Sequence, residues 1–176
     1  MELIKKLRSL TGAGMVDCQK ALKEADNDLE KAVDILRKKG IAKAAKRTDR
    51  DTNEGVVKLA VNEVGNEGYL LEVNSETDFV SRNEKFQEMA EQILEVIKDK
   101  KPDNLEELFA LPLNDLNVKD ALSNLSGTIG EKMEIKRFAI LKGETVAAYS
   151  HLGGRIGVLV ALDTPGKAEL ASEIAM

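Results

Sequence analysis

Two stretches of this sequence share one pattern, and this internal repeat limits the fold more than any other feature. Residues 55–74 (GVVKLAVNEVGNEGYLLEVN) and 145–163 (TVAAYSHLGGRIGVLVALD) each combine an apolar run, a glycine-containing loop and a second apolar run. Their offset is 89 to 90 positions, so that Gly65 corresponds to Gly154 and Gly68 to Gly157. Short Gly- and Asn-containing loops between such runs favour β-hairpins. The repeat therefore predicts two similar units, each built on an antiparallel hairpin.

Between the two hairpins the sequence is mainly helical in character. The strongest amphipathic pattern of the chain places one set of apolar side chains on a single helix face, namely Phe86, Met89, Ala90, Ile93, Leu94 and Ile97. A connector over 99–116 is punctuated by two prolines, and a second helix is expected near Val118–Leu125. It leads into a strand at Glu134–Leu141. Mixed strands and helices in this order predict an α+β fold.

After the second hairpin, GKAELASEIAM begins a helix that carries Leu170 and Ile174 on one side. The first hairpin is followed by a much longer helix, so the second unit looks cut short, as in a fragment of a longer protein. We therefore expect the apolar face of this last helix to be poorly covered.

The first forty residues predict a module of three short helices. Leu3, Ile4, Leu7 and Leu10 recur at helical spacing before TGAG ends the first helix. A second apolar stripe begins at Met15, Asp28 is a suitable N-cap for a third helix, and Gly40 is a suitable stop. The chain is thus divided into a three-helix module (1–40), a basic helical linker (41–54), a first core subdomain with its connector (55–140) and a second, incomplete core subdomain (141–176).

Composition and charge favour a protein partner over a membrane or a nucleic acid. Hydrophobic residues make up 43% and charged residues 32% of the chain, and no run of 18 apolar residues occurs. The single Cys18 cannot form an internal disulfide, which fits a reducing, cytoplasmic setting. Residues 1–50 carry a net charge of +5 within a chain of net charge −5. Such a bipolar distribution suits a protein partner with its own charge pattern.

Nucleic-acid binding remains an alternative function because Arg37–Arg50 holds seven Lys/Arg residues. This stretch has no interleaved aromatic residue, and its default interpretation is a solvated helix end and linker. An enzyme is the other alternative. His151 is the only histidine, so a Ser-His-Asp or Cys-His arrangement has no spacing to support it. No GxxxxGK[ST] phosphate loop is present, and we expect neither catalysis nor a cofactor or metal.

The segment SETDFVSRNEKF, residues 75–86, raises a more specific question about Phe79. Thr77 is a good N-cap, and Asn83 can cap a second helix, so that 77–82 is predicted to be a detached turn. One interpretation, favoured by composition alone, is that Phe79 folds back as a hydrophobic staple. The alternative is an exposed anchor for a partner.

Four segments together carry a resemblance to a known family. MELIKKLRSLTGAGMVDCQKAL, ETDFVSRNEKF, IGEKMEIKRF and YSHLGGRIGVLV occur in the order typical of the translation elongation factor Ts family, and the resemblance extends over essentially the whole chain. It implies an N-terminal ubiquitin-associated-like module and a core of two similar α+β subdomains. It also implies guanine-nucleotide exchange on elongation factor Tu, which needs no cofactor and involves contact with both GDP-bound and nucleotide-free forms of that partner.

The resemblance further implies which residues contact the partner. The turn Thr77, Asp78, Phe79 and Val80 is expected to enter the partner's nucleotide-binding domain near the magnesium and phosphates. His151 is expected to touch the partner close by, and Leu10, Met15 and Lys23 are expected to dock on the same domain. The oligomeric state stays open, with a homodimer as one option.

Overall fold

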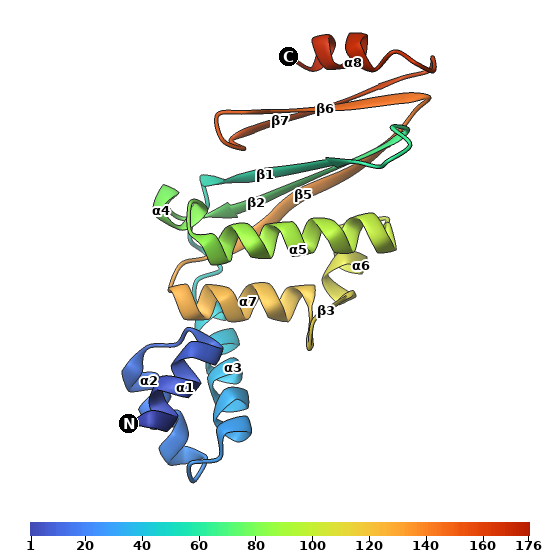
Figure 1. Ribbon diagram of the computed structural model, residues 1–176. Coiled ribbons are helices and arrows are strands. Elements are labelled where there is room, and N and C mark those ends of the chain that lie inside the picture. The colour runs from blue at the N-terminus through green and yellow to red at the C-terminus, as the bar shows by residue number, and fades with distance from the viewer.

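The structure is a computed structural model that describes residues 1–176, and it forms a stack of layers with the two chain ends at opposite ends of the stack (Figure 1). Its elements in chain order are α1 (Glu2–Thr11), α2 (Met15–Glu24), α3 (Leu29–Ala45), β1 (Glu54–Val61), β2 (Glu67–Ser75), α4 (Asp78–Ser81), α5 (Glu84–Lys100), α6 (Leu105–Ala110), β3 (Pro112–Leu113), β4 (Leu116–Asn117), α7 (Val118–Ile129), β5 (Met133–Lys142), β6 (Thr145–His151), β7 (Ile156–Leu162) and α8 (Ala168–Ala175). The predicted α+β class is confirmed.

The central layer is a three-stranded antiparallel sheet in the order β1-β2-β5. Helix α5 packs on one face of this sheet, and its apolar stripe is buried as predicted, with Phe86, Ile93 and Ile97 fully enclosed. The second hairpin, β6–β7, covers the other face, and α8 lies on the outside of that hairpin (Figure 1). The main core therefore lies between the three-stranded sheet and helices α5 and α7.

The two hairpins of the internal repeat face each other and exchange equivalent hydrogen bonds. The backbone N–H of Val57 donates to the carbonyl of Gly154 at 2.6 Å, and the N–H of Val146 donates to the carbonyl of Gly65 at 2.7 Å. Both donors and both acceptors are separated by the 89 positions of the repeat. The repeat predicted from sequence is thus a pair of hairpins related by approximate twofold symmetry.

The N-terminal module has three helices and a small core of its own around Cys18 and Leu7, which are both fully buried. Asp28 caps α3 as predicted, since its carboxylate accepts a hydrogen bond from the Lys31 N–H at 3.1 Å. The predicted stop at Gly40 is wrong, because α3 continues to Ala45. Gly40 is buried against α7, so its missing side chain allows a close helix approach instead of ending the helix.

The last helix confirms the expectation of a poorly covered apolar face. Ala171 and Ala175 are buried against the β6–β7 hairpin, whereas Leu170 is 47% exposed and Ile174 is 55% exposed. The small residues therefore face inward and the large ones face solvent.

None of the helices combines the length and the apolar character that crossing a bilayer demands.

Candidate functional site

A single helical turn, α4, separates β2 from the long helix α5, as the detached turn predicted from sequence. Asn83 begins α5, because its side chain accepts a hydrogen bond from the Lys85 N–H at 3.0 Å. Within α4, Val80 is buried in the main core and Phe79 is 83% exposed. Successive residues of a helical turn point about 100° apart, so burial of Val80 directs Phe79 outward. Phe79 is therefore an exposed aromatic residue and not a hydrophobic staple.

Contacts of α4 with itself and with the residues that follow it keep this turn closed. Asp78 forms an ion pair with Arg82 at 3.0 Å, and its carbonyl accepts a hydrogen bond from the Ser81 hydroxyl at 3.0 Å. The carbonyl of Ser81 in turn accepts a hydrogen bond from the Gln87 side chain in α5. The bond from Gln87 gives the carbonyl of Ser81, at the end of this short helix, a hydrogen-bond partner.

Thr77 occupies the N-cap position of α4, but the predicted capping role of its side chain is wrong. The Thr77 hydroxyl donates instead to Glu131 Oε1 at 2.7 Å, and the Thr77 N–H donates to Glu131 Oε2 at 3.0 Å. Glu131 follows Gly130, which ends α7 in a left-handed conformation with φ of 99°. The carboxylate accepts both donors of Thr77 at once, one at each oxygen, and so holds the start of α4 by a tertiary contact.

A second contact joins residues 76–77 to residues 131–132, this time with the carboxylate on the first segment and the donor on the second. The carboxylate of Glu76 accepts a hydrogen bond from the Lys132 N–H and forms an ion pair with Arg50 at 3.1 Å. Partial burial by itself would raise the pKa of Glu76, but the Lys132 and Arg50 contacts outweigh it and lower this pKa below its ordinary value. Residues 76–77 and 131–132 thus clasp each other through two carboxylates. The sequence segment IGEKMEIKRF contains Glu131, but spacing alone gave it no role.

His151 ends β6 and is exposed. Its ring lies 5.8 Å from that of Tyr149, centroid to centroid, with 2.9 Å between His151 Nδ1 and the tyrosine oxygen. The loop that follows reaches the start of β1, where Arg155 pairs with Glu54 at 3.2 Å. Since Glu54 is opposite Ser75 at the end of β2, the β6–β7 turn and α4 lie at the same end of the sheet (Figure 1).

The N-terminal residues expected to contact a partner lie in two separate locations. Leu10 at the end of α1 is 61% exposed, and Met15 and Val16 at the start of α2 are 53% and 62% exposed; we call these three residues, which flank the α1–α2 turn, the N-terminal apolar patch. Lys23 is exposed in the last turn of α2, about 12 Å from Met15 by helical rise. Helices α1 and α2, which carry these residues, and the turn α4 are all drawn toward the left of Figure 1.

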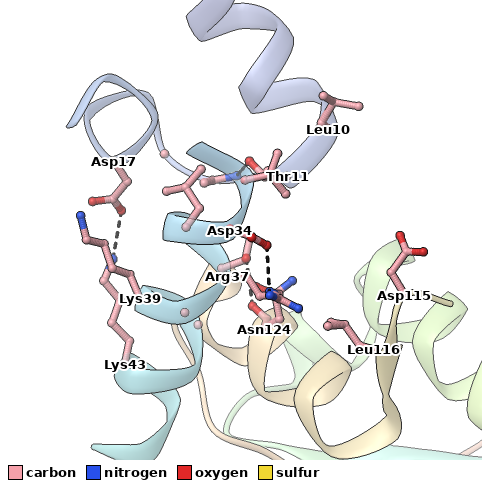
Figure 2. Close-up of a pocket in the computed structure, with 17 residues that line it drawn as sticks. Leu10, Thr11, Asp17, Asp34, Arg37, Lys39, Lys43, Asp115, Leu116 and Asn124 are labelled. Atoms are coloured by element: carbon pink, nitrogen blue, oxygen red, sulfur yellow. Dashed lines mark hydrogen bonds and ion pairs between the residues drawn. The ribbon is translucent and has the colours of Figure 1, made fainter. Parts of the chain in front are cut away.

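A hollow of about 320 Å³ lies between the N-terminal module and α7 (Figure 2). Two ion pairs, Asp17 with Lys43 and Asp34 with Arg37, each at 3.0 Å, occupy its charged rim. It contains neither histidine nor cysteine, and no group of three His, Cys, Asp or Glu side chains in the chain could hold a metal ion. Charged side chains that already neutralise each other give this hollow no evident chemistry.

Comparison with known protein families gives one match that includes the exposed turn. The model of one family, described as Elongation factor TS, matches residues 76–176, which is more than half of the chain. The matched region begins at Glu76, two residues before α4, and includes Phe79, Glu131 and His151. This match and the α+β architecture agree, and the chain belongs to the elongation factor Ts family.

Proposed function

We propose that this protein is a guanine-nucleotide exchange factor that promotes GDP release from elongation factor Tu by inserting the turn Thr77–Val80 beside the partner's magnesium and phosphates. Membership of the elongation factor Ts family implies the exchange role itself. The observation that carries the finer mechanism is an aromatic side chain, Phe79, that is 83% exposed on a turn fixed from two sides. A solvated phenyl ring on a rigid support is suited to enter a partner.

Exchange follows from a difference in affinity. A factor that binds the nucleotide-free partner more tightly than the loaded one weakens nucleotide binding by the same factor, by linkage. Full burial of a phenylalanine side chain is worth about 1.5–3 kcal/mol, which corresponds to roughly a tenfold to hundredfold change in affinity. Phe79 therefore supplies this difference in affinity if the pocket that receives it on the partner opens only when the partner's phosphate-side elements have moved.

Charged and polar groups beside Phe79 would add to this effect. Asp78 lies on the same turn and is 41% exposed, so it can pair with partner groups or disturb the ligands of the bound magnesium, which is the largest local charge there. His151 would contact the partner from the neighbouring β6–β7 turn. Leu10, Met15 and Lys23 would dock a ubiquitin-associated-like module on the same partner domain.

This function requires no bond to be made or broken in the chain itself, so we expect no cofactor and no enzymatic turnover. It also places the protein in the cytoplasm, with contact to both the GDP-bound and the nucleotide-free partner. The basic stretch 37–50 does not favour nucleic-acid binding over this function. Its side chains largely form intramolecular pairs, as Arg37, Lys39, Lys43 and Arg50 do with Asp34, Glu24, Asp17 and Glu76.

The direct test is release of labelled GDP from purified elongation factor Tu. We expect the full chain to accelerate release and Phe79→Ala to lose most of the acceleration while keeping its helical circular-dichroism spectrum. Val64→Ala is a matched control, because Val64 is 79% exposed in the β1–β2 loop at the opposite end of the sheet. Full acceleration by folded Phe79→Ala would contradict the proposal.

A further inference from the structure

Helices α3 and α7 cross at two glycines, and their backbones touch there. A Cβ atom added to Gly127 would collide with the carbonyl oxygen and Cα of Gly40. A Cβ atom added to Gly40 would lie 3.1 Å from Asn124 Oδ1. Only residues without side chains allow so close an approach. The N-terminal module is therefore seated directly on the core helix α7, as Figure 1 also shows.

The segment that joins the module to the sheet is fixed to the same region of the core. Arg47 donates to the carbonyl of Ser126 in α7 at 3.3 Å, and the carbonyl of Arg50 accepts a hydrogen bond from the Lys132 side chain at 2.8 Å. The Thr52 hydroxyl donates to Glu134 at 2.7 Å. Residues 46–53 thus run along the core and do not form a free tether.

A second contact connects the module to the region of the exposed turn. Gly12 ends α1 with φ of 69°, and a Cβ atom there would collide with the Lys85 ammonium and lie 3.4 Å from Thr128. Lys85 is in the first turn of α5, six residues after Phe79. The α1–α2 turn, which Leu10 and Met15 flank, therefore lies beside α5, the helix that follows α4.

We propose that Gly40 and Gly127 are positioning residues, which hold the N-terminal apolar patch and Phe79 at a fixed separation so that one partner molecule engages both in a single encounter. This inference rests on the proposed function. When two contact surfaces belong to one rigid body, their relative placement is already fixed before binding. Binding therefore does not have to bear the entropy cost of arranging them. The second contact then forms at high effective concentration, so affinity exceeds that of either surface alone.

The effect of Gly127→Ala on stability and on the position of the module distinguishes this role from a purely local one. Alanine is a better helix former than glycine, and Gly127 lies inside α7. If Gly127 had no contact role, Gly127→Ala would stabilise the helix and leave the module in place. If the crossing holds the module, the new methyl group pushes against the backbone of α3 and the module must shift.

The test combines a distance measurement with exchange kinetics. Spin labels at Lys20→Cys in α2 and Lys100→Cys in α5, in a Cys18→Ala background, report the placement of the module on the core by pulsed electron resonance. We expect one narrow distance distribution for the wild-type crossing and a shifted or broadened one for Gly127→Ala. Without labels, Gly127→Ala should raise the concentration for half-maximal GDP release at least tenfold and change the maximal rate less than about twofold.

Gly40→Ala is a milder companion variant, because its methyl group would be tight only against the movable Asn124 side-chain oxygen, at 3.1 Å, while the Asn124 backbone lies at ordinary contact distances of 3.6 and 3.7 Å. It should shift both readouts in the same direction, and Gly40→Ala/Asn124→Ala should restore them because the second change removes the obstructing amide. Unchanged distance and half-maximal concentration in Gly127→Ala, or in Gly40→Ala if Gly127→Ala does not fold, would overturn the inference. Absence of any wild-type exchange would instead contradict the proposed function, while the label distances would still test the crossing.

Discussion

Glu131 holds both donors of Thr77 with one carboxylate, at 2.7 Å from the hydroxyl and 3.0 Å from the backbone N–H. These residues are 54 positions apart in the chain, so the loop between α7 and β5 determines where α4 begins. The reverse bond from the Lys132 N–H to Glu76 closes the clasp. Phe79 is consequently presented by tertiary contacts and not by the short helix alone.

Loss of the Glu131 carboxylate should loosen the turn without unfolding the core. Glu131→Ala leaves both donors of Thr77 without their partner, at a cost of about 1–3 kcal/mol. We expect faster amide hydrogen exchange over residues 77–82 and slower GDP release at limiting concentrations of the factor. Glu144→Ala is the control, because Glu144 is exposed and its side chain makes no hydrogen bond or ion pair. Equal exchange protection in Glu131→Ala and the control would contradict this role.

Glu76 should make the stability of the clasp depend on pH. Its pKa is lower in the folded protein than the ordinary value of 4.5, so folding favours the ionised carboxylate. The stabilisation is fully present above about pH 4.5 and is lost as the pH falls through the lower folded value. The difference in the free energy of unfolding between wild type and Glu76→Gln should therefore shrink below this pH. Urea titrations at pH 7, 5, 4 and 3 measure it, and a constant difference would refute the assignment.

The facing hairpins leave no room for a methyl group at Gly68 or Gly157, two equivalent glycines of the repeat. A Cβ atom at Gly157 would collide with Val57 Cγ1, and one at Gly68 would lie 2.7 Å from the corresponding atom of Val146. Overpacking of this kind costs about 1–3 kcal/mol. Gly157→Ala should be destabilised by this amount in denaturant titrations, and Val57→Ala should cost less in the Gly157→Ala background than in wild type. Additive effects of the two substitutions would show that the hairpins do not press on each other there.

The two faces of α8 should respond differently to substitution. Ala171 is fully buried against the second hairpin, so Ala171→Leu should destabilise the protein by about 1–3 kcal/mol. Leu170 is about half exposed, and Leu170→Ala should change the free energy of unfolding by less than about 1 kcal/mol. Thermal unfolding followed by circular dichroism compares them, and a larger effect of Leu170→Ala would mean that its side chain is covered in solution.

Periodicity and the internal repeat were enough to predict the α+β class, both hairpins, the long helix α5 and the three N-terminal helices. These features depend on neighbouring residues, whose spacing is visible in the sequence. The helix crossing at Gly40 was missed because a glycine near the end of an apolar stripe has the same local signature whether it ends a helix or admits another backbone. Its actual partner, Gly127, is 87 positions away.

The candidate site, too, could be predicted only in part from the sequence. The detached turn at 77–82 follows from local capping residues, and it made exposure of Phe79 a reasonable expectation. The carboxylates of Glu76 and Glu131 gave no signal, because acidic residues in a charged chain are solvated by default. Their role depends on which backbone donors the fold brings within hydrogen-bond distance.

Binding of the factor to the two states of elongation factor Tu tests the central claim about Phe79 most directly. Dissociation constants of wild type and Phe79→Ala should be measured by titration calorimetry against the nucleotide-free and the GDP-bound partner. We expect Phe79→Ala to weaken binding to the nucleotide-free partner roughly tenfold to a hundredfold and to leave binding to the GDP-bound partner within about twofold. An equal loss of affinity for both states would contradict the claim that Phe79 drives exchange.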